Sequence, residues 1–124
     1  VEQYRHAVGE SLLEIPAGKL TEKEDPMECA VRELEEEVGM TAGRWSFLCR
    51  FYTSPGFSDE LLHLYLAEEL TEGASKPEED EFLRVHRVYL DEAYRMVREG
   101  TIRDSKTVAG ILMACLRSTG IRRP

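Results

Sequence analysis

Hydrophobic and polar positions follow two different periods along the 124-residue chain. Apolar side chains recur at helical spacing from residue 26 to 38 and again after residue 104, which predicts two amphipathic helices. A shorter helix is expected from Asp91 to Glu99. Strand-like segments are expected at 1–15, 45–52 and 82–89, the second of them alternating and rich in aromatic residues, and the apolar run at 61–67 predicts a buried strand. This order of elements predicts an α/β fold in which helices flank a mixed β-sheet.

The borders of the first long helix are well marked. Asp25 is a natural N-cap, Pro26 suits the first helical position, and Glu28 stands where a capping box needs an acid. Gly39 is suited to the left-handed residue that ends a helix. The sequence therefore predicts a helix with fixed ends, preceded by a loop.

Turn-forming residues predict the connections between the other elements. A turn is expected at 41–43, a loop around Pro55-Gly56 from residue 53 to 60, and an acidic solvated loop from residue 68 to 80. Asp91 and Asp104 are the expected N-caps of the last two helices.

Composition narrows the class of protein. The chain is 42% hydrophobic and 32% charged, as in a soluble globular protein. A net charge of −8 argues against non-specific nucleic-acid binding, which needs a basic surface. Three cysteines without a CxxC pair indicate reduced thiols in a cytoplasm. No apolar run in the sequence reaches membrane-spanning length, and we expect no signal peptide. Lys106 is expected to be a surface charge.

Carboxylates are concentrated on one flank of the first long helix. Glu33, Glu36 and Glu37 lie close together at helical spacing, and like charges this close are destabilising unless a cation compensates them. Hard carboxylate oxygens suit Mg²⁺, Mn²⁺ or Ca²⁺. The alternative is a solvated acidic face, the usual meaning of a charge run. The helix already has a separate apolar face, and the glycine-bearing loop 16–20 leads into it, so we favour a cation site.

Residues 18–40 resemble the signature of the Nudix hydrolases at every fixed position. These positions are Gly18, Glu24, Arg32, Glu33, Leu34, Glu36, Glu37, Gly39 and Met40. The resemblance implies an α/β/α sandwich and hydrolysis of a nucleoside diphosphate linked to another moiety. It also implies one Nudix domain over residues 1–124. Because the chain begins at Val1 inside a strand pattern, we expect an N-terminal segment of the family to precede it.

The same resemblance assigns roles in metal binding. The implied cofactor is Mg²⁺ or Mn²⁺, with oxygen ligands from the carbonyl of Ala17 and from Glu33, Glu36, Glu37 and Glu81. Arg32 orients the glutamates and pairs with Glu24, a supporting role around the metal. Bound cations would neutralise charge on the phosphates and lower the pKa of an attacking water.

The general base is expected in the acidic loop 78–81. On the residues alone, a solvated loop is the better interpretation. Resemblance to the ADP-ribose pyrophosphatase branch instead implies Glu79 as the base and Glu81 as a metal ligand. A register shifted by one residue would give these roles to Glu78 or Asp80.

Other features also resemble the ADP-ribose pyrophosphatase branch. Pro55 lies sixteen residues after Gly39, as in that branch. The resemblance implies that Arg5 holds a phosphate and that Glu60 accepts hydrogen bonds from ribose hydroxyls. The full set of implied substrate-binding residues is Arg5, Glu14, Leu20, Pro55, Gly56, Phe57 and Glu60.

The function implied by this branch is hydrolysis of ADP-ribose to AMP and ribose 5-phosphate. Two alternatives stay open: a pyrophosphatase for another nucleotide-sugar or dinucleotide, and a non-catalytic Nudix module that binds a ligand. The intact glutamate set disfavours the binding module, since a sensor has no need of metal ligands. By resemblance, the expected partners are a small-molecule substrate and a second copy in a homodimer.

Overall fold

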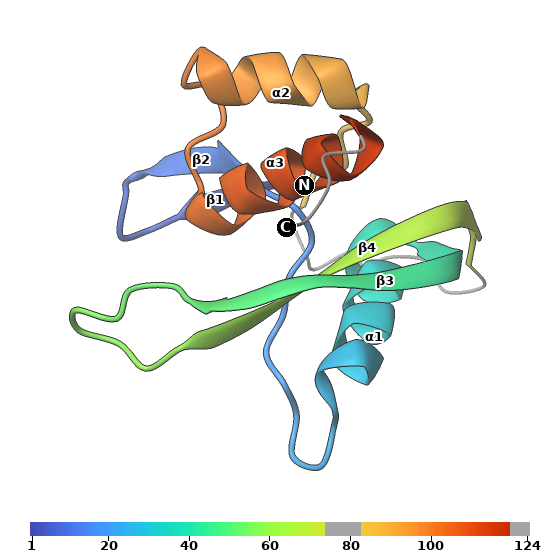
Figure 1. Cartoon of the computed structure of the whole chain (residues 1–124). Helices are drawn as coiled ribbons and strands as arrows, with labels where there is room; N and C mark the ends of the chain where they lie inside the picture. The colour runs from blue at the N-terminus through green and yellow to red at the C-terminus, as the bar shows by residue number, and fades with distance from the viewer. Residues whose placement is uncertain (74–82, 120–124) are drawn as a thin grey trace. The chain divides into compact units, whose positions relative to one another are not determined.

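The computed structural model describes residues 1–73 and 83–119. These residues belong to two compact units. The terminal unit combines residues 1–15 with the chain from Arg84 onward, and the central unit comprises residues 16–83. In Figure 1 the terminal unit is coloured dark blue and orange to red, and the central unit light blue to yellow-green.

The central unit contains the predicted long helix, α1 (Pro26–Val38). The Asp25 side chain accepts from the backbone of Met27 and Glu28, and Glu28 completes the capping box. Gly39 adopts a left-handed φ of 72° and donates its N–H to the carbonyl of Glu35. The predicted borders of this helix are confirmed.

Two long antiparallel strands follow, β3 (Met40–Tyr52) and β4 (Leu61–Glu72). The predicted connecting loop at 53–60 is confirmed. The turn expected at 41–43 was wrong, because these residues belong to β3, where Thr41 pairs with Thr71 and the two hydroxyls lie 3.0 Å apart. Residues 68–72, expected in a solvated loop, are the paired end of β4.

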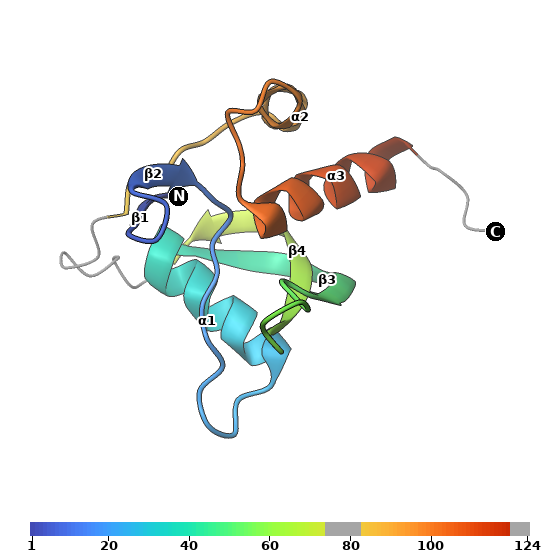
Figure 2. The same ribbon diagram turned by 90° about the vertical axis from the view of Figure 1, so that its left-hand side faces the viewer.

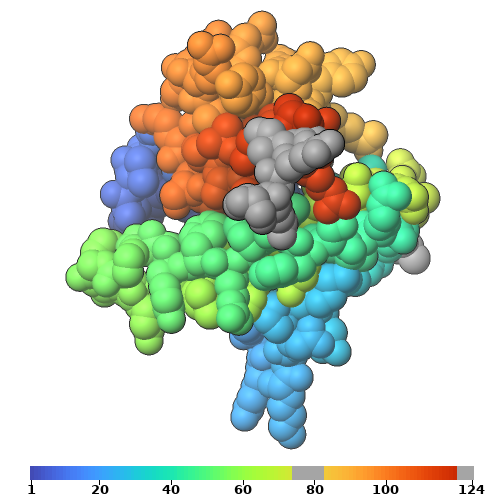
Figure 3. Space-filling model, viewed as in Figure 1, coloured from blue at the N-terminus to red at the C-terminus, as the bar shows by residue number. Residues whose placement is uncertain are grey.

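Helix α1 packs against both β3 and β4 within the central unit (Figures 1 and 2). Cys29 of α1 and Leu64 of β4 are buried, and the rings of Phe47 and Tyr65 meet edge to face across the strands. The loop from residue 16 to 25 runs back along α1 before turning into it (Figure 2) and projects as a narrow lobe in Figure 3. This course brings the loop backbone to the acidic flank of the helix.

The terminal unit begins with a short antiparallel hairpin, β1 (Glu2–Arg5) and β2 (Glu10–Leu13). The strand character predicted for residues 1–15 is thus confirmed as two strands. After the central unit, the chain re-enters the terminal unit at Arg84. The carbonyl of Arg84 accepts from the N–H of Glu2 in an isolated β-bridge.

The strand predicted for residues 82–89 was wrong over its described part. Between residues 83 and 89 the only β-pairing is the bridge at Arg84. Val85 and Val88 are exposed there, so they lack a packed sheet face that would stabilise an extended strand. Phe82 lies outside the described residues.

Two helices complete the terminal unit, α2 (Leu90–Arg98) and α3 (Ser105–Thr119). The expected N-cap Asp91 was wrong: Tyr89 precedes the helix in an extended conformation, and Asp91 lies in the first turn, where its charge still suits the helix dipole. The N-cap Asp104 is confirmed, since its Oδ2 accepts from the backbone N–H of Thr107 at 3.2 Å.

A small hydrophobic core joins α2 and α3. It is formed by Ala93, Ile102 and Ile111, with Leu13 of β2 packed against it. The expected α/β class is confirmed, and the strand pairs that the structure describes are both antiparallel where a mixed sheet was expected. Among the described residues, every helix is too short or too polar to cross a membrane.

Candidate active site

Arg32 of α1 is the centre of a charged network in the central unit. Its Nε and Nη2 donate to the two carboxylate oxygens of Glu24, at 2.8 and 3.0 Å. This two-point contact matches the planar guanidinium to the planar carboxylate. The Nη2 group also donates to the carbonyl of Lys19 at 3.1 Å, so Arg32 ties the loop before α1 to the helix.

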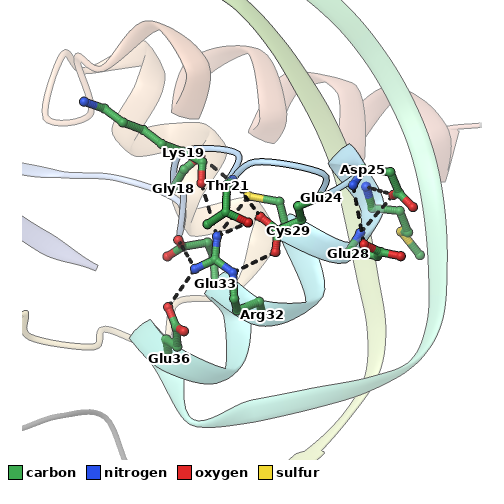
Figure 4. Close-up of polar contacts among 11 residues, drawn as sticks. Gly18, Lys19, Thr21, Glu24, Asp25, Glu28, Cys29, Arg32, Glu33 and Glu36 are labelled. Atoms are coloured by element: carbon green, nitrogen blue, oxygen red, sulfur yellow. Dashed lines mark hydrogen bonds and ion pairs between the residues drawn. The ribbon is translucent and has the colours of Figure 1, made fainter.

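The remaining guanidinium nitrogen faces the metal-ligand candidates. Nη1 of Arg32 donates to Glu33 at 2.8 Å and to Glu36 at 3.0 Å, as Figure 4 shows. Arg32 thereby compensates Glu33 and Glu36 as well as Glu24, which offsets the repulsion expected between the two helix carboxylates. The predicted pairing of Arg32 with Glu24 and its contact with the helix glutamates are both present in this geometry.

The network shifts the titration of its members. Hydrogen bonds from Arg32 and from the backbone of Thr21 hold the pKa of Glu24 at about 2, well below its ordinary value. The hydrogen bond to Glu24, together with Glu33, raises the pKa of Arg32 further above its usual range. Both groups are therefore ionised throughout the physiological range.

The loop backbone touches the helix at Gly18. A Cβ added to Gly18 would lie 1.9 Å from Cδ of Glu33, so a side chain at this position would displace that carboxylate. The buried thiol of Cys29 donates to the carbonyl of Gly18 at 3.8 Å, and burial raises the pKa of this thiol. Cys29 is thus a small packing residue beneath the loop.

Ala17 and Glu37, both predicted metal ligands, are brought together. The backbone N–H of Ala17 donates to Oε2 of Glu37 at 3.1 Å. The structure therefore places loop residues 17 and 18 against two of the three helix carboxylates.

Metal binding at this site is compatible with the donor chemistry of its residues. In the described part of the chain, no three His, Cys, Asp or Glu side chains stand arranged around one ion. Glu33 and Glu36 instead point to Arg32, and Glu37 points to the N–H of Ala17. All three are carboxylates on one helix flank, and Arg32 keeps its two-point contact with Glu24 if they rotate toward a cation. The oxygen set fits a hard divalent cation.

The predicted substrate residues of the central unit lie on its loops. Pro55, Gly56 and Phe57 form the turn between β3 and β4, with the Phe57 ring 90% exposed. Glu60 accepts from the hydroxyl of Thr53 at 2.7 Å at the base of this loop, and Leu20 is half exposed in the loop before α1.

Arg5 and Glu14, in the terminal unit, form an ion pair with each other. Nε and Nη2 of Arg5 donate to the two carboxylate oxygens of Glu14 at 2.8 and 2.7 Å. The Glu14 side chain is buried, whereas that of Arg5 reaches the surface.

Comparison with known proteins identifies the family. The family model for the NUDIX domain matches residues 1–110. The chain belongs to the Nudix family.

The curated relatives of this Nudix chain are named for different functions. It is 49% identical to a methanol dehydrogenase activator from Bacillus methanolicus and 46% identical to an ADP-ribose pyrophosphatase from Bacillus subtilis, over 90% of the chain and 61% of each relative. An ADP-ribose pyrophosphatase from Mycobacterium tuberculosis is 41% identical over the whole chain and 61% of the relative. The chain thus spans about three fifths of the length of these relatives.

A solved structure supports the Nudix fold. The crystal structure of an ADP compounds hydrolase superposes with a TM-score of 0.83 over 96% of this chain and 65% of the other, at 22% sequence identity. At this identity the likeness concerns the fold, and it confirms the predicted fold class.

Lys106 was expected at the surface, and this prediction was wrong. Its side chain is only 12% exposed, and its Nζ donates to Glu14 and, at 3.0 Å, to Asp104. One local signal for this burial is present in the sequence. Asp104 is the N-cap of α3, and Lys106 lies in the first helical turn, close enough to pair with its carboxylate. The partner Glu14 is distant in sequence, so no local pattern connects the two.

The remaining predicted residues cannot be placed. Glu79 and Glu81, the expected base and additional ligand, lie outside the described residues, as do Glu78 and Asp80. Their roles stay predictions.

Proposed function

We propose that this chain carries the catalytic region of a Nudix pyrophosphatase that hydrolyses ADP-ribose to AMP and ribose 5-phosphate. The observation that carries the proposal is the complete set of Nudix side chains around Arg32, with Glu24, Glu33 and Glu36 on the guanidinium and Glu37 against the preceding loop. Two relatives named ADP-ribose pyrophosphatase, at 46% and 41% identity, support the choice of substrate.

The proposed cofactor is Mg²⁺ or Mn²⁺. It would be held by the carboxylates of Glu33, Glu36 and Glu37 and by the carbonyl of Ala17. When bound, the cation supplies charge neutralisation at the diphosphate and a lower pKa for the attacking water. Arg32 keeps the ligand carboxylates on one side of the helix, and Gly18 leaves space for Glu33.

In the proposed reaction water adds to one phosphorus of the diphosphate, and the bridging P–O bond breaks. The proton released by the water passes to a general base, for which Glu79 is our candidate, with Glu81 as a further metal ligand. Each product leaves with its own phosphate, AMP on one side and ribose 5-phosphate on the other.

The proposed substrate contacts divide between phosphate, sugar and base. Arg5 would hold a phosphate, Glu60 the ribose hydroxyls, and the exposed Phe57 ring would offer an aromatic face to the adenine. Leu20, Pro55 and Gly56 would shape the adjoining loops. Glu14, predicted in the same set, is buried and paired with Arg5, so it would act on the substrate through Arg5.

A substrate panel tests this function. The chain is incubated with Mg²⁺ and ADP-ribose, GDP-mannose, diadenosine polyphosphates or nucleoside triphosphates, and products are separated by chromatography. We expect AMP and ribose 5-phosphate from ADP-ribose, with the Glu37→Gln variant as a control for contaminating hydrolases. Preference for GDP-mannose, the substrate in the names of relatives at 35–37% identity, would change the substrate, and activity in excess EDTA would reject the mechanism.

A second candidate function is activation of a dehydrogenase. It is favoured by the relative named methanol dehydrogenase activator, which at 49% identity is as similar as the pyrophosphatases. The test adds the chain to a methanol dehydrogenase and measures the rate of methanol oxidation. Loss of this stimulation in Glu37→Gln would show that hydrolysis and activation depend on the same site.

We further propose a homodimer in a cytoplasm. Support for the cytoplasm comes from three free cysteines, one of them buried, which suits reducing conditions. The dimer, and the status of residues 1–124 as a single domain, rest on the family resemblance. Sedimentation of the chain at several concentrations would test the dimer.

A further inference from the structure

Four charged side chains meet in the terminal unit, from β1, the end of β2 and the start of α3. Glu14 is at the centre, with a side chain only 2% exposed. Its Oε1 accepts from Lys106 and Arg5, and its Oε2 accepts from Arg5. Asp104 holds Lys106 from the other side. The cluster thus runs in the order Asp104, Lys106, Glu14, Arg5.

The two cations differ in their access to solvent. The Lys106 side chain is 12% exposed and that of Arg5 is 42% exposed. Glu14 therefore connects a largely buried ammonium group to a guanidinium at the surface. An incoming ligand has little access to the largely buried ammonium group of Lys106, whereas it can reach the guanidinium of Arg5.

The buried end of the cluster is anchored to α3. Asp104 caps the helix by accepting from the N–H and the hydroxyl of Thr107, at 3.2 and 2.6 Å. The same hydroxyl accepts from the N–H of Ile15 at 2.9 Å, which fixes the backbone beside Glu14. The Glu14 carboxylate is consequently held both through its backbone and through Lys106.

Glu14 stays ionised in this position. Burial alone would raise the pKa of Glu14, but hydrogen bonds from Arg5 and Lys106 outweigh burial and lower it below its ordinary value. A buried carboxylate with one of its two cations removed would be poorly compensated, and its orientation would no longer be fixed from the helix side.

The geometry points to Lys106 as a positioning residue that fixes the Arg5 guanidinium, through Glu14, for a phosphate of the substrate. The phosphate part of this inference rests on the proposed function, but the fixing of Arg5 does not. Lys106 acts here without touching the substrate. Glu14 is then the connecting carboxylate, which accounts for its burial better than direct contact with a substrate does.

The orientation of Arg5 can be measured without any substrate. In a ¹H–¹⁵N spectrum at mildly acidic pH, the Nε–H of Arg5 should give a signal protected from exchange by its bond to Glu14, assigned by its loss in Arg5→Lys. We expect this signal to broaden or disappear in Lys106→Met and to persist in Lys106→Arg, which retains a cation. Lys106→Gln is a second neutral variant, of good helix propensity, should the methionine variant fail to fold.

Arg103 offers a matched control. Its Nη2 pairs with Glu10 of β2, so it too joins this hairpin to the segment around the start of α3. Both of these side chains are about half exposed, and Glu10 is not part of the Glu14 cluster. Arg103→Met should leave the Arg5 signal unchanged. Equal loss in Arg103→Met and Lys106→Met would show general loosening of the hairpin and overturn the inference.

Kinetics test the phosphate part. Lys106→Met should raise KM for ADP-ribose about 10- to 100-fold, the range of one hydrogen bond to a charged group, with kcat little changed. In a variant that already carries Arg5→Met, adding Lys106→Met should raise KM no further, because Lys106 acts through Arg5. Additive effects would overturn the inference. Absence of hydrolysis by the wild type would reject the proposed function alone, since the Arg5 signal still decides the role of Lys106.

Discussion

Gly18 and Glu33 lie so close that a single methyl group on Gly18 would occupy the position of the Glu33 carboxyl group. The added carbon would be 1.9 Å from Cδ and 2.0 Å from Oε1 of Glu33. The glycine that opens the Nudix signature is thus explained by contact between loop and helix. Backbone freedom is not the reason, since Gly18 is absent from the residues with positive φ.

We predict that Gly18→Ala displaces Glu33 and lowers kcat by about 100-fold, because a misplacement of about 1 Å at a reacting centre has effects of this size. The free energy of unfolding should change little, because the displaced atoms are the end of a flexible side chain beside an exposed loop residue. Steady-state kinetics and urea unfolding measure the two effects.

Gly73→Ala is the matched control, since a Cβ there meets its nearest atoms at 3.4 Å, an ordinary contact. It should leave kcat near that of the wild type. A Gly18→Ala variant with normal kcat would mean that the Glu33 carboxylate can move without consequence for the reaction.

The ion pair between Glu24 and Arg32 predicts a specific pH dependence. The pKa of Glu24 is about 2 in the folded chain, against an ordinary value of 4.5. A lowered pKa means that folding favours the ionised form, so the stability it contributes is complete above pH 4.5 and is lost as the pH falls toward 2.

We therefore expect Glu24→Gln to destabilise the chain at neutral pH and to approach the wild type in acid. Urea unfolding of both proteins across this pH range gives the difference in unfolding free energy. Glu22→Gln, in the same loop and exposed, controls for the general loss of a carboxylate. Identical pH profiles for the two variants would contradict a specific role of the Arg32 pair.

Features that depend on neighbouring residues could be predicted from the sequence. The caps of α1 are of this kind, because Asp25 and Glu28 bond within one turn. The shared helix flank of Glu33, Glu36 and Glu37 is another, since helical geometry places these carboxylates, and metal binding by them stays a prediction. The structure adds that Arg32 holds the first two of these directly.

Features that depend on distant partners could not be predicted. Strands β3 and β4 extend past their hydrophobic segments because Thr41 pairs with Thr71, and propensity alone indicated a turn and a loop there. Lys106 resembles any surface lysine in the sequence, and its burial follows from Glu14, 92 residues away. In both cases tertiary contacts outweigh the local signal.

The last prediction concerns metal binding by the helix flank, which can be tested without turnover. A ligand that binds the folded chain stabilises it in proportion to the logarithm of its concentration over Kd. Mg²⁺ should therefore raise the Tm of the wild type, even though the cation must draw Glu33 and Glu36 away from Arg32 and Glu37 away from the N–H of Ala17.

Glu33→Gln and Glu37→Gln should each weaken this effect, because a neutral amide replaces a charged ligand. The apparent Kd for Mg²⁺ should rise at least about 10- to 100-fold, the loss seen even for residues that only support a metal ligand. Glu28→Gln is the control on the same helix, since glutamine also serves in a capping box and the residue lies in the first turn, away from the flank. If Glu33→Gln and Glu37→Gln respond to Mg²⁺ as the wild type does, these carboxylates serve in their contacts with Arg32 and with the N–H of Ala17, and the metal ligands must lie elsewhere.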